Sequence, residues 1–381
     1  LHKEDYQKYL DEQAKHFIRI NPHPEDSNIV ILNYTKRATY ERHWTHETMS
    51  ARGLILDTSE FDTTGIVYIL AEPIDKFYNL GEYPEYEKDI ELENFTVAME
   101  KMDGSLGISY YFKGEIRWAT RGSFDSDQSV RANKIWKEKY AERFETYNFD
   151  YFNYPFTMLA EIIYPQNRVV VDYGDMEDLV MLGAKDIHNV FGFNDEDWSY
   201  DKFKEYALDL KMPVCNQVEG SLDDLLKLRE MVDANTEGWI LRYPNNKRLK
   251  IKGLEYIDIH RRRFHVTTKM VAKAWSENTV EQVIFDVPEE FRNEVESVRD
   301  KLDEELVSVR ESVEYEFNKL KRFFGEDRRA YAQFIGMKYS RNSEFKHFLF
   351  DAYKHGEVQD DIIKKQIFKD YRKVLGVVES E

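Results

Sequence analysis

Two lysines on one short predicted strand could bind phosphate groups. The segment Leu249–Lys252 alternates apolar and basic residues, and alternate residues of a strand share a face. Leu249 and Ile251 are therefore expected to point into a core, with Lys250 and Lys252 on the opposite face about 7 Å apart. Two ammonium groups on one stiff strand suit a polyphosphate. An edge strand whose lysines discourage aggregation has the same pattern, so the pair alone is weak evidence.

A third lysine lies at the end of an earlier apolar run. Lys101 is followed by Met102 and an Asp103-Gly104 turn. This K-x-D-G pattern is a weak motif by itself, because a β-turn with a solvated lysine looks the same.

Two glutamates follow the K-x-D-G motif in a fixed order. Glu161 lies inside an apolar run, and Glu237 opens the strand that precedes Lys250. From Lys101 onward, the four elements are separated by 60, 76 and 13 residues. Their ordered combination is much more specific than any one of them.

Strands and short helices are expected to hold these residues within the first 255 positions. Apolar runs and turn residues predict strands at 29–32, 53–57, 65–71, 95–99, 107–112, 115–120, 156–163, 168–172, 179–184, 238–243 and 248–252. The three runs between 95 and 120 are expected to be successive paired strands. Segments 125–147 and 222–232 are predicted helices.

After about residue 256 the pattern changes to helical periodicity. Nine apolar steps separate Phe291 from Phe324, or about 3.7 residues per step, close to the helical repeat. Gly325 suits the end of this helix, and 331–353 and 360–375 are expected to be two more. We therefore predict two domains, 1–255 and 256–381.

The ordered motifs resemble the covalent nucleotidyltransferase superfamily of ATP-dependent ligases and capping enzymes. Over roughly residues 30–260 the chain looks like the T-even bacteriophage RNA ligase 1 family. The segments that carry this likeness are Arg52-Gly53, Lys76-Phe77-Tyr78-Asn79-Leu80, Thr120-Arg121-Gly122-Ser123, Asn167-Arg168-Val169-Val170 and Glu255-Tyr256. The resemblance implies an α+β fold. An adenylyltransferase domain of antiparallel sheets with flanking helices would precede an all-helical C-terminal domain with a role in RNA-substrate specificity.

The implied activity is ATP-dependent RNA ligation in three nucleotidyl transfers. Lys101 would attack the α-phosphorus of ATP, the resulting AMP would pass to an RNA 5′-phosphate, and a 3′-hydroxyl would displace it. A free lysine is protonated near pH 7, so nearby positive charge or desolvation must lower its pKa. Mg²⁺ or Mn²⁺ is the expected metal cofactor. Single-stranded RNA ends, including those of nicked tRNA, are the expected partners.

The same resemblance assigns the site residues. Lys101, Lys250 and Lys252 would form the catalytic set. The implied nucleotide-binding residues are Arg52, Lys76, Tyr78, Gly104, Arg121, Glu161, Glu237, Gly238, Lys250 and Lys252, and the implied metal ligands are Glu161 and Glu237. The family has lysine where this chain has Arg121. A planar guanidinium is not equivalent to an ammonium at a phosphate site, so the role of Arg121 stays open.

Three alternatives fit part of this pattern. A DNA ligase or a GTP-using capping enzyme would share the nucleotidyltransferase fold, but the residues after Lys252 read as helices rather than as an OB-fold barrel. A nucleotide-sensing RNA-binding module without activity would have no reason to keep the lysines and both glutamates.

The charge balance bears on the partner. The chain has 54 basic and 72 acidic residues, a net charge of −18, which by itself disfavours nucleic acid. Between Lys247 and Lys273, however, nine basic residues oppose two acidic ones, a net charge of +7. This stretch predicts a local, salt-sensitive RNA footprint. The acidic segment 286–305 is not expected to touch RNA.

Composition also suggests where the protein acts. The single Cys215 forbids an internal disulfide and fits a reducing compartment. No apolar run of about 18 residues and no signal peptide are visible. We therefore expect the protein in the cytoplasm, which would be the host cytoplasm if the gene is carried by a phage. A monomer is a separate expectation that does not follow from composition.

Overall fold

The computed structural model describes residues 1–147, 155–187 and 197–376. The chain divides into two compact units, Leu1–His260 and Arg261–Glu381. The predicted division after residue 255 falls in the first turn of helix α10 (Leu254–Arg263).

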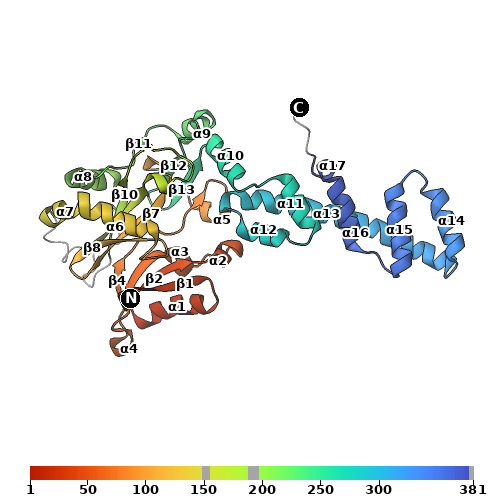
Figure 1. The fold of residues 1–381 in the computed structure, drawn as a ribbon, viewed down its shortest axis with the longest axis horizontal. Coiled ribbons are helices and arrows are strands. Elements are labelled where there is room, and N and C mark those ends of the chain that lie inside the picture. The colour runs from red at the N-terminus through yellow and green to blue at the C-terminus, as the bar shows by residue number, and fades with distance from the viewer. Residues whose placement is uncertain (148–154, 188–196, 377–381) are drawn as a thin grey trace. The chain divides into compact units, whose positions relative to one another are not determined.

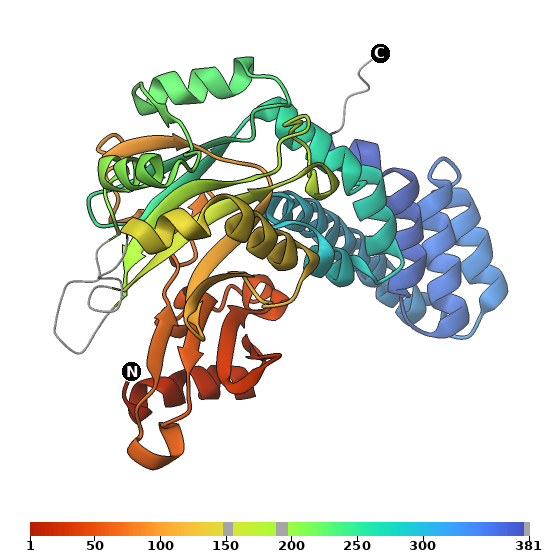
Figure 2. The ribbon, with the colours of Figure 1, turned by 60° about the vertical axis from the view of Figure 1, so that its left-hand side comes forward.

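The N-terminal sheet has the strand order β1-β2-β3-β4, and all of its pairs are antiparallel. Its strands are β1 (Ile18–His23), β2 (Asp26–Tyr34), β3 (Arg52–Asp57) and β4 (Tyr68–Ala71). Helix α1 (Lys3–Ala14) lies along this sheet (Figures 1 and 2), where Tyr6 and Tyr9 pack against Leu32 and Leu54. Short helices accompany the strands: α2 (Lys36–Tyr40), α3 (His46–Ser50) and α4 (Phe61–Thr64).

The second sheet has the order β10-β9-β7-β8 and is also antiparallel. Its strands are β7 (Ser105–Phe112), β8 (Glu115–Thr120), β9 (Phe156–Ile163) and β10 (Asp178–Asp186). All eight residues of β9 are buried, as its continuous apolar run predicts. The helices α6 (Asp127–Lys139) and α7 (Ala141–Tyr147) and the 3₁₀ turn Pro165–Asn167 lie in its connections.

The third sheet has the order β11-β6-β12-β13-β5. Its strands are β5 (Tyr78–Asn79), β6 (Val97–Glu100), β11 (Gln217–Val218), β12 (Gly238–Arg242) and β13 (Arg248–Lys252), and its helices are α5 (Pro84–Glu87), α8 (Tyr200–Leu210) and α9 (Leu222–Met231). Only β13 and β5 run parallel. One core cluster joins Val97 and Met99 of β6 to Ala160 and Ile162 of β9, so the second and third sheets pack together.

The second unit consists of helices over the residues described, 261–376. They are α11 (Thr268–Ser276), α12 (Val280–Asp286), α13 (Glu289–Phe324), α14 (Arg328–Lys338), α15 (Ser343–His355), α16 (Asp360–Lys369) and α17 (Tyr371–Leu375). The long α13 has 36 residues and contacts α11, α12, α14, α15, α16 and α17. These helices and the antiparallel sheets confirm the predicted α+β fold class. Among the described residues, no helix is long and apolar enough to cross a membrane.

Two predictions about strands are wrong. Residues 168–172 form no strand, because the backbone N–H groups of Val170 and Val171 donate to the Asp103 carboxylate at 2.7 and 2.8 Å instead of to a ladder. Strand β6 does not pair with β7. It pairs with β11 and β12 of a different sheet, so the chain changes sheets at the K-x-D-G turn.

Three predicted helices are divided. The first breaks at Tyr140, whose hydroxyl binds Asp178 of β10. The second breaks before Asn342, which caps α15 by accepting a hydrogen bond from the Phe345 N–H at 3.0 Å. The third breaks at Asp370. Apolar periodicity continues across such breaks, so it does not reveal them.

Candidate active site

Three strand ends bring the sequence motifs together. Strand β12 is antiparallel to both β6 and β13, with Trp239 opposite Glu100 and Gly238 opposite Lys252. The residue after Glu100 is Lys101, whose backbone N–H donates to the Gly238 carbonyl at 2.8 Å. Lys101, Gly238 and Lys252 therefore lie side by side across three neighbouring strands, at the same end of these strands.

A buried carboxylate joins two of the lysines. Glu237 Oε1 lies 2.6 Å from Lys101 Nζ and 3.5 Å from Lys252 Nζ. The Glu237 side chain is 3% exposed. Its second oxygen, Oε2, is buried and has no hydrogen-bond partner among the described residues. A buried acceptor without a partner is costly, so this oxygen is available to a ligand.

Glu161 reaches the same place from the second sheet. In the β7–β9 pair, Glu161 lies opposite Leu106. The Gly104 backbone N–H donates a hydrogen bond to the Glu161 carboxylate. Burial raises the pKa of Glu161 to about 8, and the negative charges of Glu237 and Asp103 add to this rise, although Lys101 opposes it. Without a bound cation, Glu161 therefore carries a proton at neutral pH.

Strand β13 has the predicted two faces. Leu249 and Ile251 are 0% and 2% exposed, whereas Lys250 and Lys252 are partly exposed. This confirms the expectation that both lysines project from the face opposite the core.

One aromatic ring contacts two cations. Lys250 Nζ lies 4.9 Å from the centre of the Phe77 ring, and the guanidinium carbon of Arg52 lies 5.2 Å from it. Arg52 also donates to the Ile74 carbonyl at 3.1 Å. Phe77 reaches this position because β5 pairs with β13, with Tyr78 opposite Leu249. The sequence analysis used Phe77 only as part of the segment Lys76–Leu80 and did not assign it to the site, because its position in the sequence does not reveal this contact.

Lys76 and Tyr78 are covered by other side chains. Lys76 is 2% exposed, and its Nζ lies 4.1 Å from the centre of the Tyr78 ring and donates to the Phe77 carbonyl at 3.1 Å. Tyr78 is also 2% exposed and packs edge-on against Trp44 at 5.8 Å. The described contacts do not bring either residue to Lys101, so their roles toward a nucleotide stay predictions.

Arg121 makes a contact that uses its planar group. Its guanidinium carbon lies 5.0 Å from the centre of the Tyr34 ring, and its Nη1 donates to the Tyr34 hydroxyl at 2.9 Å. Tyr34 in turn packs edge-on against Trp44 at 5.3 Å. A planar guanidinium can stack on an aromatic ring and donate a hydrogen bond at the same time, which the ammonium group of lysine cannot do.

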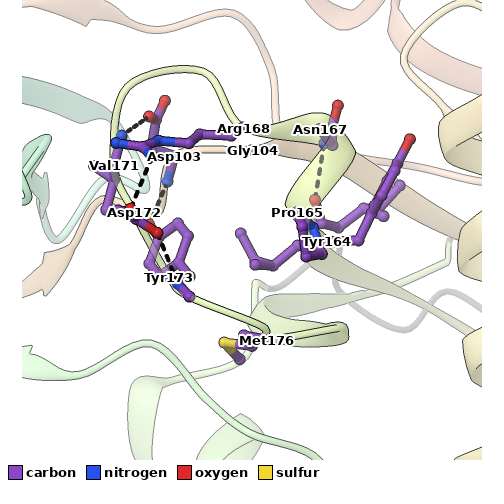
Figure 3. Close-up of a pocket in the computed structure, with 13 residues that line it drawn as sticks. Asp103, Gly104, Tyr164, Pro165, Asn167, Arg168, Val171, Asp172, Tyr173 and Met176 are labelled. Carbon is purple, nitrogen blue, oxygen red and sulfur yellow. Dashed lines mark hydrogen bonds and ion pairs between the residues drawn. The ribbon is translucent and has the colours of Figure 1, made fainter.

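Asp103 connects the lysine turn to two other segments, 170–173 and the one that contains Tyr256. The sequence analysis missed these contacts because it took Asp103 only as part of a turn. The Asp103 carboxylate accepts hydrogen bonds from the backbone N–H groups of Val170 and Val171 and, at 2.9 Å, from the Tyr256 hydroxyl. Its own N–H donates to the Tyr173 hydroxyl at 2.9 Å. Figure 3 shows Asp103 and Tyr173 beside a cavity of about 120 Å³ that is also lined by Gly104, Tyr164, Asn167 and Met176. Asp103 therefore fixes the backbone that follows Lys101.

Two glycines are required by close packing within the protein. A Cβ on Gly238 would lie 1.9 Å from the Ile251 carbonyl oxygen, and its φ of +141° is unfavourable for other residues. A Cβ on Gly104 would lie 2.7 Å from the Ile162 carbonyl oxygen. Gly238 of β12 thus packs against β13, and Gly104, in the turn before β7, packs against β9. Contact with a nucleotide stays a prediction for both glycines.

Folding offsets much of the positive charge expected between residues 247 and 273. Arg248 forms a buried ion pair with Asp197 at 2.6 Å, and Lys252 shares Glu237 with Lys101. In the second unit, Arg261 pairs with Glu294 at 2.9 Å. The partners come from distant parts of the sequence, so the local count of +7 overstates the free charge of this stretch.

The carboxylates suit a metal that is bound together with phosphate. The described residues contain no group of three or more His, Cys, Asp or Glu side chains that could hold an ion. Mg²⁺ usually takes only one or two protein carboxylates and completes its shell with water and substrate phosphates. The open Oε2 of Glu237 and the carboxyl group of Glu161 fit that donor set.

A family model described as RNA ligase matches residues 50–256, slightly more than half of the chain. The chain belongs to the RNA ligase family. The matched range contains every predicted site residue, and it confirms the predicted family and enzyme class.

Individual relatives of this RNA ligase are distant. An RNA ligase of Rhodothermus phage RM378 is 23% identical over 308 residues, covering 62% of this chain and 69% of the phage protein. A putative bifunctional polynucleotide kinase/RNA ligase of Autographa californica nuclear polyhedrosis virus is 24% identical, covering 62% of this chain and 34% of the viral protein. Among solved structures, an archaeal ATP-dependent RNA ligase has a TM-score of 0.45 at 13% identity, covering 72% of this chain and 68% of that one.

Proposed function

We propose that this RNA ligase uses ATP to join RNA 5′-phosphate and 3′-hydroxyl ends through an AMP carried on Lys101. The observation that supports this most directly is the position of Lys101 Nζ, 2.6 Å from buried Glu237 and beside Lys252. The carboxylate lies between the two ammonium groups, so the proposed nucleophile has a proton acceptor in direct contact and a second cation nearby for the phosphates.

In the first step the lysine has to be a neutral amine. Glu237 Oε1, 2.6 Å from Nζ, is placed to accept the proton that the amine gives up. A P–N bond then forms between Nζ and the α-phosphorus of ATP. The bond from that phosphorus to the bridging oxygen breaks, and pyrophosphate leaves.

Cations already in position would stabilise the charge on the phosphates. Lys250 and Arg52 are fixed against Phe77, so they need little rearrangement to meet an anionic group. Preorganised charge of this kind provides most of the catalysis in phosphoryl transfer.

A divalent cation fits between the carboxylates and the phosphates. Glu237 and Glu161 would hold Mg²⁺ or Mn²⁺, which when bound supplies positive charge at the phosphate oxygens. Glu161 has to release its proton to bind a cation, and the cation's own charge favours that release.

The remaining two steps transfer the AMP and seal the ends. An oxygen of the RNA 5′-phosphate attacks the phosphorus on Lys101, and the P–N bond breaks to regenerate the amine. The 3′-hydroxyl oxygen then attacks the 5′-phosphate phosphorus and AMP leaves. We expect single-stranded RNA ends as substrates, with nicked tRNA among them, and a monomeric enzyme.

Covalent labelling tests the proposal. The protein is incubated with Mg²⁺ and ATP labelled at the α-phosphate, with Lys101→Ala as the variant and exposed Lys137→Ala as its matched control. We expect label on the wild type and the control and none on Lys101→Ala. Absence of label on freshly deadenylylated wild-type protein would overturn the proposal.

The same assay separates the alternatives. Labelling by GTP in preference to ATP would indicate a capping-type enzyme. Sealing of 5′-phosphorylated DNA in preference to RNA would indicate a DNA ligase. Binding of nucleotide without any covalent label would indicate the nucleotide-sensing module.

A further inference from the structure

Charge is divided unevenly along the helical unit. The first part of α13, residues 289–316, has 11 acidic and four basic residues, a net charge of −7. Residues 317–355, which complete α13 and form α14 and α15, have nine basic and four acidic residues, a net charge of +5. In Figure 1, α14 and α15 lie beside the C-terminal part of α13. One end of this unit is therefore basic although the whole chain is strongly acidic.

Among the described residues, eight of the nine cations of the basic end form no ion pair with a carboxylate. The nine are Lys319, Lys321, Arg322, Arg328, Arg329, Lys338, Arg341, Lys346 and Lys354. Within the described part of the chain, only Lys338 forms an ion pair, at 2.6 Å from Glu316. In the acidic part, by contrast, Arg299 pairs with Glu281 and Arg310 with Asp360. Uncompensated positive charge at one end of a unit attracts a polyanion.

Four of these cations flank one turn. Lys321 and Arg322 end α13, Arg328 and Arg329 begin α14, and all four are exposed. Between them lie Phe323, whose side chain is 81% exposed, and the exposed Glu326 and Asp327, so four basic and two acidic residues leave this turn a net charge of +2. A single exposed apolar side chain is common on protein surfaces, so it is the combination of this ring with the cations around it that is informative. Basic side chains around an exposed aromatic ring are typical of surfaces that bind RNA, because phosphates meet the cations and a base stacks on the ring.

We propose that this basic surface, defined as Lys321, Arg322, Phe323, Arg328 and Arg329, binds the phosphate backbone and an unpaired base of the RNA substrate. The proposal rests on the proposed RNA ligase function and assigns the binding to one end of the helical unit. The acidic part of α13 repels RNA and so restricts contact to this surface.

Charge removal tests the proposal with a matched control. In the test variant Lys321, Arg322, Arg328 and Arg329 are replaced by Ser. In the control four exposed lysines of the same unit, Lys301, Lys365, Lys369 and Lys373, are replaced by Ser. For sealing of 5′-phosphorylated RNA, we expect KM of the test variant to rise on the order of tenfold. The slope of log KM against log salt concentration should decrease by about 3, at roughly 0.7–0.9 for each phosphate contact that is lost. The control should change little.

Phe323 has its own control on the same helix. Tyr315 is 73% exposed but lies in the acidic part of α13. Phe323→Ser should raise KM for RNA by about tenfold through the loss of base stacking, and Tyr315→Ser should leave it unchanged. Equal KM values for these two variants would contradict stacking on Phe323.

Labelling of Lys101 separates this proposal from the proposed function. The first step requires no RNA, so every variant should label with ATP as the wild type does. Normal labelling with unchanged KM and salt dependence for RNA would overturn the basic surface and leave the ligase function standing. Absence of label on the wild type would instead overturn the ligase function.

A measurement on the wild-type protein tests the proposal even if the variants do not fold. Lysines of the wild-type enzyme are acetylated with and without 5′-phosphorylated RNA and compared by mass spectrometry. We expect RNA to protect Lys321 at least threefold and to leave Lys301 unprotected. Equal modification of Lys321 in both samples would overturn the proposal.

Discussion

The cations of the two units are held in different ways. In Leu1–His260, Lys101 and Lys252 share Glu237, Arg248 pairs with Asp197, and Lys250 lies on Phe77. At the basic surface of the helical unit, the cations have no carboxylate partner among the described residues. A cation that takes part in bond making has to be fixed in place, whereas one that attracts RNA gains from being free. This difference predicts that substitution of a paired cation lowers stability or activity strongly, whereas substitution of an unpaired surface cation changes stability little.

The largest effect on stability is expected at the buried ion pair. Arg248 and Asp197 side chains are only 6% and 9% exposed. Arg248→Met leaves a buried carboxylate without its partner, which typically costs about 3–5 kcal/mol. The free energy of unfolding in urea measures this loss. The matched Lys321→Met removes an exposed, unpaired cation and should change stability by less than about 0.5 kcal/mol. Equal losses in the two variants would contradict the comparison.

The largest effect on activity short of losing Lys101 is expected at Glu237. Glu237→Gln removes the charge that holds Lys101 and Lys252, and it removes the open carboxylate oxygen. We expect the rate of Lys101 labelling to fall by about 10²–10³-fold, as for other preorganised charges in active sites. Glu219→Gln, an exposed position, is the control. A loss below tenfold would show that the bridge between the lysines is structural only.

A smaller effect is expected at Phe77. Phe77→Leu removes the ring under Arg52 and Lys250, and cation–π contacts are worth roughly 0.5–2 kcal/mol. KM for ATP in the labelling reaction should rise about fivefold to tenfold, with a smaller change in kcat. Phe112→Leu is a matched control, because the Phe112 ring also contacts two cations, Lys113 and Arg117. Similar KM changes in both variants would indicate a general loss of packing.

The smallest effect concerns pH and Glu161. The carboxyl group has a pKa of about 8 in the folded protein and about 4.3 in the unfolded chain. Between these values the folded state keeps a proton that the unfolded chain has released, so the contribution of Glu161 to stability falls as pH rises. Without metal, Tm should therefore fall less between pH 6 and pH 8.5 in Glu161→Gln than in the wild type. Parallel Tm curves would contradict the raised pKa.

Sequence reasoning succeeded where one local rule decides the outcome. Alternation placed Lys250 and Lys252 on one face, and periodicity predicted α13 to within two residues of its start. It failed where a distant group competes for the backbone. The Asp103 carboxylate takes the N–H groups that a strand at 168–172 would need, and no local pattern reveals that.

The same limit applies to the site. The order of the motifs identified Lys101, Glu161, Glu237 and Lys252, which the structure brings together. The positions of Phe77 and Asp103 depend on which strands pair, and strand pairing is a long-range property of the fold. The charge count around residue 250 failed for this reason too, because Asp197 and Glu237 come from other parts of the chain.

The contact between Lys101 and Glu237 has a consequence for the enzyme at rest. Aldehydes and acylating agents in a cell react with neutral amines, and they meet exposed lysines first. The Lys101 amine is in contact with the buried Glu237 carboxylate, and its side chain is only 20% exposed. If Lys101 is the nucleophile, as we propose, the same contact with Glu237 would also shield its amine from such reagents before a nucleotide binds.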